Sequence, residues 1–202
     1  AEIDAICNAY NVLVVQSAGN ISVSGGIPYL GIQDHLVAGR NYPDYLYESS
    51  CRVANPGQSL QALTVGSVAY GANEAPPWRS FAQEPGQPSA FTSSGFGIWN
   101  VIKPEIVERG GDAIRTNAGD IQIGGVIPNT CPELVRSTMF PPGPAYDKDQ
   151  AGTSFAAPKV SRIAASLQLA LPEEPALLYR ALIVQSATWP AWAEAMLTEL
   201  RQ

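Results

Sequence analysis

A seven-residue segment, Gly152-Thr153-Ser154-Phe155-Ala156-Ala157-Pro158, places a serine where a helix is predicted to begin. The small and apolar residues that follow form one helical stripe, and Pro172 lies beyond the predicted end of the helix. A hydroxyl group in the first turn of a helix lies beside backbone N–H groups that have no partner inside the helix. Because those groups can stabilise a developing oxyanion, Ser154 is a candidate nucleophile.

The composition is that of an ordered chain with few charges. The 202 residues are 46% hydrophobic and 15% charged, which suits one globular domain and argues against disorder. The net charge of −6 disfavours a nucleic acid or an anionic membrane as a partner, and no apolar run is long enough to cross a membrane. Cys7, Cys51 and Cys131 form neither a metal-ligand pattern nor a disulfide framework. With no signal peptide seen at the start, this cysteine usage favours the cytoplasm.

Helices and buried strands alternate along the chain, which is typical of an α/β protein. The apolar spacing of residues 3–10 predicts a helix, which leads into Val12-Leu13-Val14-Val15, a run typical of a strand buried on both faces. A second buried strand is predicted over residues 63–68. Residues 21–60 and 70–100 are rich in glycine and proline and are expected to be loops. Further predicted elements are short strands near Ile106 and Ile121-Gln122-Ile123, and helices that start at Pro175 and Ala191.

The serine segment and one upstream segment together resemble the subtilisin-like serine proteases, or subtilases. The first matches the family's nucleophile motif, Gly-Thr-Ser, one variable residue, Ala, one small residue and Pro. The second, Val14-Val15-Gln16-Ser17-Ala18-Gly19-Asn20, is similar to the strand that leads to the family's oxyanion asparagine. The resemblance covers residues 10–186. It implies that Ser154 is the nucleophile and that Asn20 is an oxyanion donor.

Other stretches match the family in the same order along the chain. Glu108-Arg109-Gly110 is a departure, because it stands where the family has Ala-Pro-Gly. The matching stretches are Asn55-Pro56-Gly57, Leu63-Thr64-Val65-Gly66-Ser67-Val68, Ala90-Phe91-Thr92-Ser93-Ser94-Gly95 and Lys103-Pro104-Glu105-Ile106-Val107.

The resemblance also implies a fold and a substrate class. The expected fold is α/β with a doubly wound, mostly parallel subtilisin-like sheet, of which residues 1–202 would be the C-terminal part. Gln16, Ser17, Ala18 and Gly19 would wall the pocket for the substrate residue before the cut. The substrate would be a peptide or protein. No cofactor is implied, and no metal site can be assigned.

The other two groups of the family's catalytic triad have no counterpart in this chain. In the family an aspartate and a histidine both precede the oxyanion asparagine, and the nineteen residues before Asn20 contain no histidine. The sole histidine, His35, follows Asn20 and lies next to Asp34 in a predicted loop. We therefore expect His35 to be a solvated loop residue and not the general base.

Three explanations for the missing groups stay open. The chain is part of a longer complete protease, one piece of a processed protease, or a pseudoprotease that binds peptides without cutting them. In the first two cases the function is serine endopeptidase, with this chain inactive by itself. Missing upstream strands would leave an apolar sheet edge, so we also expect self-association or pairing with the N-terminal half.

Overall fold

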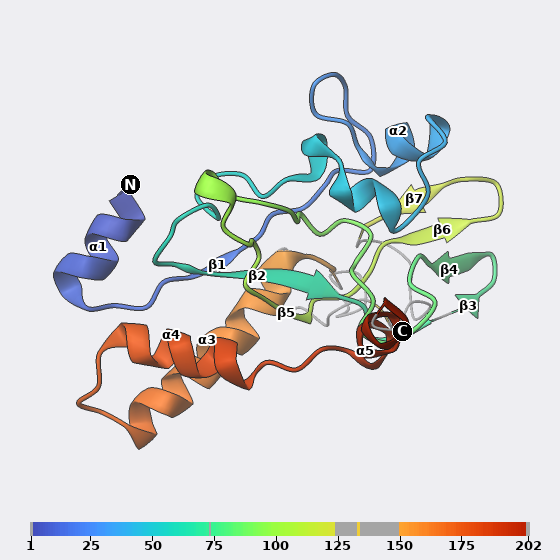
Figure 1. Ribbon diagram of the computed structural model, residues 1–202. Helices are drawn as coiled ribbons and strands as arrows, with labels where there is room; N and C mark the ends of the chain where they lie inside the picture. The colour runs from blue at the N-terminus through green and yellow to red at the C-terminus, as the bar shows by residue number, and fades with distance from the viewer. Residues whose placement is uncertain (1, 73, 124–132, 134–149, 201–202) are drawn as a thin grey trace, which may run out of the picture.

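The structure is a computed structural model that describes residues 2–72, 74–123, 133 and 150–200. The described helices and strands form a parallel sheet, an antiparallel sheet and a group of C-terminal helices (Figure 1). In chain order they are α1 (Glu2–Tyr10), β1 (Val15–Ser17), α2 (Ile32–Val37), the 3-10 helices η1 (Asp44–Tyr47) and η2 (Ser49–Cys51), β2 (Leu63–Val68), β3 (Glu74–Ala75), β4 (Trp78–Ser80), the 3-10 helix η3 (Ile98–Asn100), β5 (Ile106–Arg109), β6 (Ile114–Thr116), β7 (Ile121–Gln122), α3 (Thr153–Ala170), α4 (Ala176–Ser186) and α5 (Ala191–Leu200).

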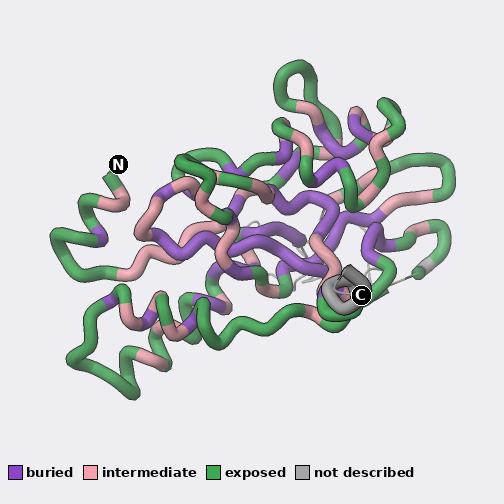
Figure 2. The backbone as a smooth tube through the Cα atoms, viewed as in Figure 1, coloured by how far each residue is buried: buried purple, intermediate pink, exposed green. Residues whose placement is uncertain are grey.

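The parallel sheet has the strand order β1-β2-β5, so β2 lies at its centre. Val15 pairs with Leu63 on one side of β2, and Val65 pairs with Ile106 on the other. Every residue of β2 is buried, as the sequence predicted for residues 63–68 (Figure 2). Helix α3 packs against all three strands and against α4. This arrangement confirms the predicted α/β class with a mostly parallel sheet.

Strand β1 differs from the prediction in both its position and its burial. The expected strand was Val12-Leu13-Val14-Val15 with both faces buried, whereas β1 begins at Val15 and all three of its residues are only half-buried. Val12 is 41% exposed. The physical reason is that β1 pairs with β2 alone among the described strands, so its other edge has no neighbouring strand to cover it.

An antiparallel sheet with the order β3-β4-β6-β7 lies beside the parallel one. The sequence indicated only its last strand, near residues 121–123. Strands β3 and β4 fall in residues 70–100, which were expected to be loop; the two pair on either side of Pro76 and Pro77. The prediction was wrong there because Pro76 and Pro77 occupy the turn and not the strands. The hydrogen bonds between β3 and β4 therefore lose no backbone N–H group.

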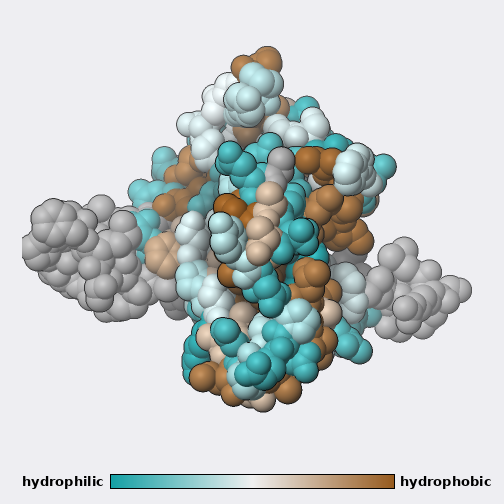
Figure 3. Space-filling view, turned by 90° about the vertical axis from the view of Figure 1, so that its left-hand side faces the viewer, coloured by the Kyte–Doolittle hydropathy of each residue, from teal (hydrophilic) through white to brown (hydrophobic). Residues whose placement is uncertain are grey.

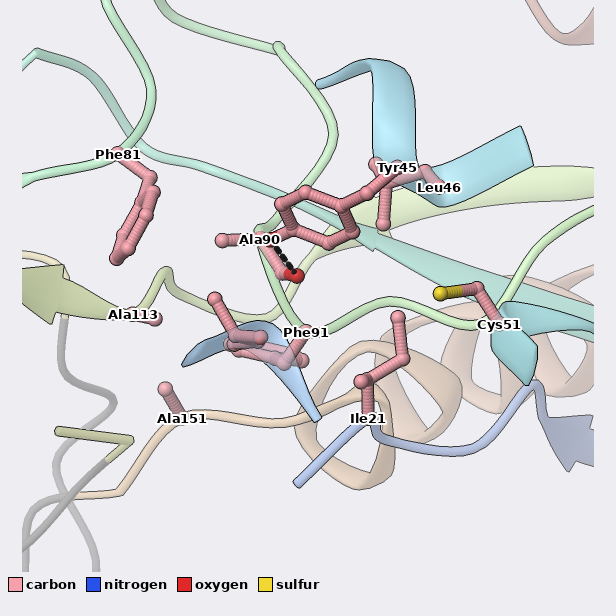
Figure 4. Close-up of a cluster of buried hydrophobic side chains, with 10 residues drawn as sticks. Ile21, Tyr45, Leu46, Cys51, Phe81, Ala90, Phe91, Ala113 and Ala151 are labelled. Carbon is pink, nitrogen blue, oxygen red and sulfur yellow. Dashed lines mark hydrogen bonds between the residues drawn. The ribbon is translucent and has the colours of Figure 1, made fainter. Parts of the chain in front are cut away.

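Residues 21–60 are also more structured than predicted. They contain α2, η1 and η2, and they contribute to an apolar core at the carboxyl end of β1. In that core the Tyr45 hydroxyl donates to the Ala90 carbonyl oxygen at 2.5 Å (Figure 4). The Ile21 N–H donates to the Phe91 carbonyl oxygen at 2.7 Å. The segment is therefore held by tertiary contacts that local composition does not reveal.

One carboxylate joins three segments of the chain at the opposite end of the parallel sheet. Glu105 accepts from the Thr64 N–H at 2.8 Å, from the Lys103 ammonium at 2.6 Å and from the Arg180 guanidinium at 2.7 Å. Lys103 is 2% exposed and also donates to the Ala62 carbonyl oxygen at 3.2 Å. A buried lysine needs such partners, because an unpaired charge there would be strongly destabilising.

The C-terminal helices follow the prediction closely. Helix α3 begins at Thr153, one residue before the expected start, and α5 begins at Ala191 as predicted. The predicted stripe of α3 is buried at Ala156 and Val160, but Ile163 is 44% exposed. Figure 3, which faces the end of the molecule that carries α1, shows apolar patches among polar ones on this surface.

Candidate functional site

The backbone at the end of β1 fixes the position of Asn20. The Ala18 N–H donates to the Val65 carbonyl oxygen at 2.9 Å, and the Gly19 carbonyl oxygen accepts from the Ser93 N–H at 3.0 Å. Gly19 has a φ of +105°, a conformation that a side chain would strain. Asn20 then forms an isolated antiparallel bridge with Thr92 and is exposed.

Ser154 lies in the first turn of α3 and is exposed, whereas Thr153 beside it is buried. The Gly152 N–H, just before the helix, donates to the Gly110 carbonyl oxygen at 2.9 Å. A Cβ atom at Gly110 would lie 2.5 Å from the Gly152 carbonyl oxygen and 2.5 Å from the Ser67 hydroxyl, so this contact has no room for a side chain. Gly110 directly follows Glu108 and Arg109, the end of β5 where the sequence departs from the family's pattern, and is therefore a close-packed support of the Ser154 turn.

Asn20 and the Ser154 turn meet through Thr153. The Asn20 Oδ1 atom accepts from the Thr153 N–H at 3.0 Å and from the Thr153 hydroxyl at 2.9 Å. The same hydroxyl accepts from the Gly19 N–H at 3.2 Å. With Oδ1 engaged twice, the Asn20 Nδ2 donor is directed away from Thr153. Nδ2 would lie 2.9 Å from a Cβ atom at Gly152, which shows that the amide packs against the turn.

This geometry places two kinds of hydrogen-bond donor at the turn that carries the exposed Ser154. One is the start of α3, where backbone N–H groups lack helical partners, and the other is the oriented amide of Asn20. Oriented donors beside a serine hydroxyl are a feature that stabilisation of a tetrahedral oxyanion would require. The sequence analysis did not predict that Thr153 orients the Asn20 amide, although Thr153 was part of the motif.

The four residues predicted to wall a pocket lie at the end of β1. Gln16, Ser17 and Gly19 are half-buried, and Ala18 is 2% exposed. A Cβ atom at Gly57 would lie 3.4 Å from the Ser17 carbonyl oxygen, so the turn that contains Gly57 packs against this strand. The sequence match at residues 55–57 located that turn but did not predict this contact.

The prediction that His35 is a solvated loop residue is wrong. His35 lies in α2 and is 0% exposed. Its Nδ1 atom is 3.2 Å from a guanidinium nitrogen of Arg40, and its Nε2 atom is 3.0 Å from the Ser50 hydroxyl. Asp34 does not face it; the Asp34 carboxylate accepts from the Gly25 and Gly31 N–H groups at 2.8 Å each. The Nδ1 atom, which would face the carboxylate in a catalytic triad, is bonded to arginine instead, and that His35 is not the base stays a prediction.

Asp112 holds three backbone segments together behind the site. Its carboxylate accepts from the N–H groups of Ala82, Ala90 and Ala113 at 2.7–2.8 Å. Asp112 is 0% exposed, and this burial raises the pKa of its carboxyl group to about 7, against the effect of the three N–H donors. Ala90 precedes Phe91, whose carbonyl oxygen receives the Ile21 N–H, so Asp112 supports the backbone next to Asn20.

Within the described residues, no group of three or more metal-ligating side chains is close enough to hold an ion. Cys7 and Cys51 are free buried thiols, and Cys131 lies outside the described residues. No helix in the described part of the chain has the length and apolar character needed to span a membrane.

Comparisons with known proteins agree with the resemblance seen in the sequence. The sequence pattern of the subtilase family, peptidase S8, matches residues 2–200. An uncharacterised protein, y4bN, of Sinorhizobium fredii (strain NBRC 101917 / NGR234) is 30% identical over 210 residues, which span 98% of this chain and 45% of that protein. No solved structure matches the chain. The chain belongs to the subtilase family.

Proposed function

We propose that the protein is a serine endopeptidase in which Ser154 attacks the scissile carbonyl and forms an acyl-enzyme. The Asn20 amide and the Ser154 N–H hold the oxyanion, and Gln16, Ser17, Ala18 and Gly19 contact the substrate residue before the cut. The observation that carries the proposal is the double engagement of Asn20 Oδ1 by Thr153 beside an exposed Ser154. A contact from the buried Thr153 that orients an exposed amide suits a binding role better than a purely structural one.

A serine hydroxyl is a weak nucleophile without an adjacent base. His35 is not oriented as that base, and the 202-residue sequence contains no other histidine. We therefore propose that an aspartate and a histidine come from polypeptide outside these residues, and that residues 1–202 are the C-terminal part of the peptidase domain. The chain spans about 45% of the length of the relative it matches, which leaves room for such a segment.

The open edge of β1 is the place proposed for that segment. β1 has β2 as its neighbour and no second one among the described strands. A groove of about 340 Å³ runs beside this edge, between β1 and helices α3 and α4. Added backbone would pair with β1 and cover the exposed Val12. The groove is lined in part by Val12, Leu13, Val15, Ala164, Ala165 and Tyr179.

A fluorophosphonate probe tests the proposal, because it adds mass only to an activated serine. We expect the polypeptide as the cell makes it to gain mass in a way that Ser154→Ala abolishes. The 202-residue chain by itself should be folded by circular dichroism, self-associate in size-exclusion chromatography with light scattering, and remain unlabelled.

Three outcomes would each count against part of the proposal. Labelling of Ser154 in the 202-residue chain alone would contradict the need for an external base. An unlabelled cellular polypeptide that still binds peptides would favour the alternative, a peptide-binding pseudoprotease. A monomer in light scattering would count against an open β1 edge.

A further inference from the structure

The segment that follows Asn20 contains a cluster of polar groups around one buried histidine. The ring of His35 stacks on the ring of Tyr45, with centroids 5.3 Å apart and planes 11° apart. Its Nε2 atom is 3.0 Å from the Ser50 hydroxyl and 3.4 Å from the Cys51 thiol. None of these contacts belongs to the proposed reaction.

The contact with Arg40 decides where the imidazole proton lies. A guanidinium can only donate, so the Nδ1 atom of His35 must accept at its 3.2 Å contact with Arg40. The ring is then neutral, with its proton on Nε2, and it donates to Ser50. Taking up a second proton would place hydrogen on Nδ1, break the bond from Arg40 and set two positive charges against each other.

The other charged or titratable groups around the ring do not remove this conflict. Glu48 pairs with Arg40 at 3.5 Å instead of contacting the ring, and Asp34 is engaged by two backbone N–H groups. Burial, followed by the charge of Arg40, lowers the pKa of His35 below its usual 6.5, while Glu48 and Asp34 act in the opposite direction. The folded state therefore binds fewer protons than the unfolded state as the pH falls below 6.5, and stability is lost on acidification.

A chain of contacts joins this cluster to Asn20. The ring of His35 stacks on Tyr45, and the Tyr45 hydroxyl donates to the Ala90 carbonyl oxygen. The next residue, Phe91, accepts from the N–H of Ile21, the residue that follows Asn20. Figure 4 shows Tyr45, Ala90, Phe91 and Ile21 within one apolar core.

We propose that His35, Arg40, Tyr45 and Ser50 form an acid-sensitive lock, which holds the segment after Asn20 in place when His35 is neutral and releases it when His35 is protonated. The lock itself depends only on the contacts among these four residues. Its effect on the oxyanion donor rests on the proposed function of Asn20.

The single histidine of the chain makes a direct test possible, because its NMR signals need no assignment. Ring ¹⁵N spectra should show a protonated Nε2 and an unprotonated Nδ1 at neutral pH, and a titration below pH 6.5. Arg40→Met, which keeps the aliphatic stem but removes the charge and the donor, should move that titration to higher pH. A proton on Nδ1, or a titration at or above pH 6.5, would overturn the lock.

Hydrogen exchange, corrected for its intrinsic pH dependence, tests the release. Amides of residues 32–51 should lose protection as the pH falls below 6.5, while amides of β2 keep theirs. His35→Gln should remove this loss, because a glutamine amide can accept from Arg40 and donate to Ser50 without titrating. Equal loss in both proteins would refute the lock. If His35→Gln does not fold, Arg40→Met gives the same comparison with a weaker expected loss.

The link to the site is read from the rate at which the probe labels Ser154 in the cellular polypeptide. Acidification should slow labelling more in the wild type than in His35→Gln, and an equal effect would break the link. Failure of labelling at every pH would contradict the proposed function. The lock would then be tested by the NMR and hydrogen-exchange results, which do not depend on that function.

Discussion

Two serines of this molecule have opposite surroundings. Ser50 lies 3.0 Å from a histidine ring, is half-buried and has an arginine where a catalytic triad has a carboxylate. Ser154 has no histidine among the described residues near it, but it is exposed at the start of a helix and beside an oriented amide. The difference teaches that a serine–histidine contact is not an active site by itself. The direction of the hydrogen bonds decides whether a histidine can act as a base. Here His35 donates to the Ser50 hydroxyl, so it cannot accept the hydroxyl proton.

Exchanging the two serines for alanine gives the largest expected contrast. In the polypeptide as the cell makes it, Ser154→Ala should lower kcat for a peptide substrate by about 10⁶, the loss known for the nucleophile of another subtilase. Ser50→Ala should leave kcat within about tenfold, since it removes one hydrogen bond to a buried ring. Initial rates on a fluorogenic peptide would measure both, and comparable losses would erase the distinction between the two serines.

The next effect concerns the amide that distinguishes the exposed serine. Asn20→Ala should lower kcat by about 10²–10³ with little change in KM, the magnitude known for this donor in another subtilase. Thr153→Val removes one of the two donors to Asn20 Oδ1 and should cost less, and Thr153→Ser should restore the rate. A Thr153→Val variant with raised KM and unchanged kcat would argue against an orienting role.

Substitution of Gly110 tests how the turn that carries Ser154 is supported. Gly110→Ala should lower the free energy of unfolding by about 1–3 kcal/mol, because the new Cβ atom meets the Gly152 carbonyl oxygen and the Ser67 hydroxyl. Gly26→Ala is the matched control, since a Cβ atom there meets nothing within 4 Å. Urea unfolding would compare the two variants, and similar losses would mean that the Gly110 contact is not tight.

A pH dependence is expected at Asp112, whose carboxylate accepts from the Ala90 N–H next to the Tyr45 contact. Its pKa is raised to about 7 from 3.8, so the folded state holds its proton longer and the contribution of Asp112 to stability falls as the pH rises through that window. Asp112→Asn does not titrate and loses one acceptor for the three N–H groups. Relative to the wild type, the variant should therefore be most destabilised at low pH. A constant difference in unfolding free energy from pH 4 to about pH 8 would contradict this pKa.

The sequence predicted the elements whose signals are local. The start of α3, the buried strand at 63–68 and the family pattern were all visible because short runs of neighbouring residues specify them. It did not predict that β1 would be half-buried, because an apolar run reads the same in a central strand and in an edge strand. Burial of that kind depends on which neighbours are present.

The surroundings of His35 show the other limit of sequence reasoning. The glycine- and proline-rich residues 21–60 predicted a loop, yet Arg40, Tyr45 and Ser50 converge on His35 and bury it. These partners lie 5–16 positions away, counting Cys51, with no periodicity that could indicate a common face. The tautomer of the ring became evident only once its nearest donor was known.

The carboxylate of Glu105 gives the molecule a reporter of how its C-terminal part assembles. The same group accepts from the Thr64 N–H in β2, from Lys103 and from Arg180 in α4, which lies 75 positions along the chain from Glu105. Arg180 and Lys103 donate to Oε1 and the Thr64 N–H donates to Oε2, so the docking of α4 restrains the carboxylate that the Thr64 amide uses. Solvent exchange at the single amide of Thr64 should thus follow the docking of α4, and a folding experiment could time that event without any added label.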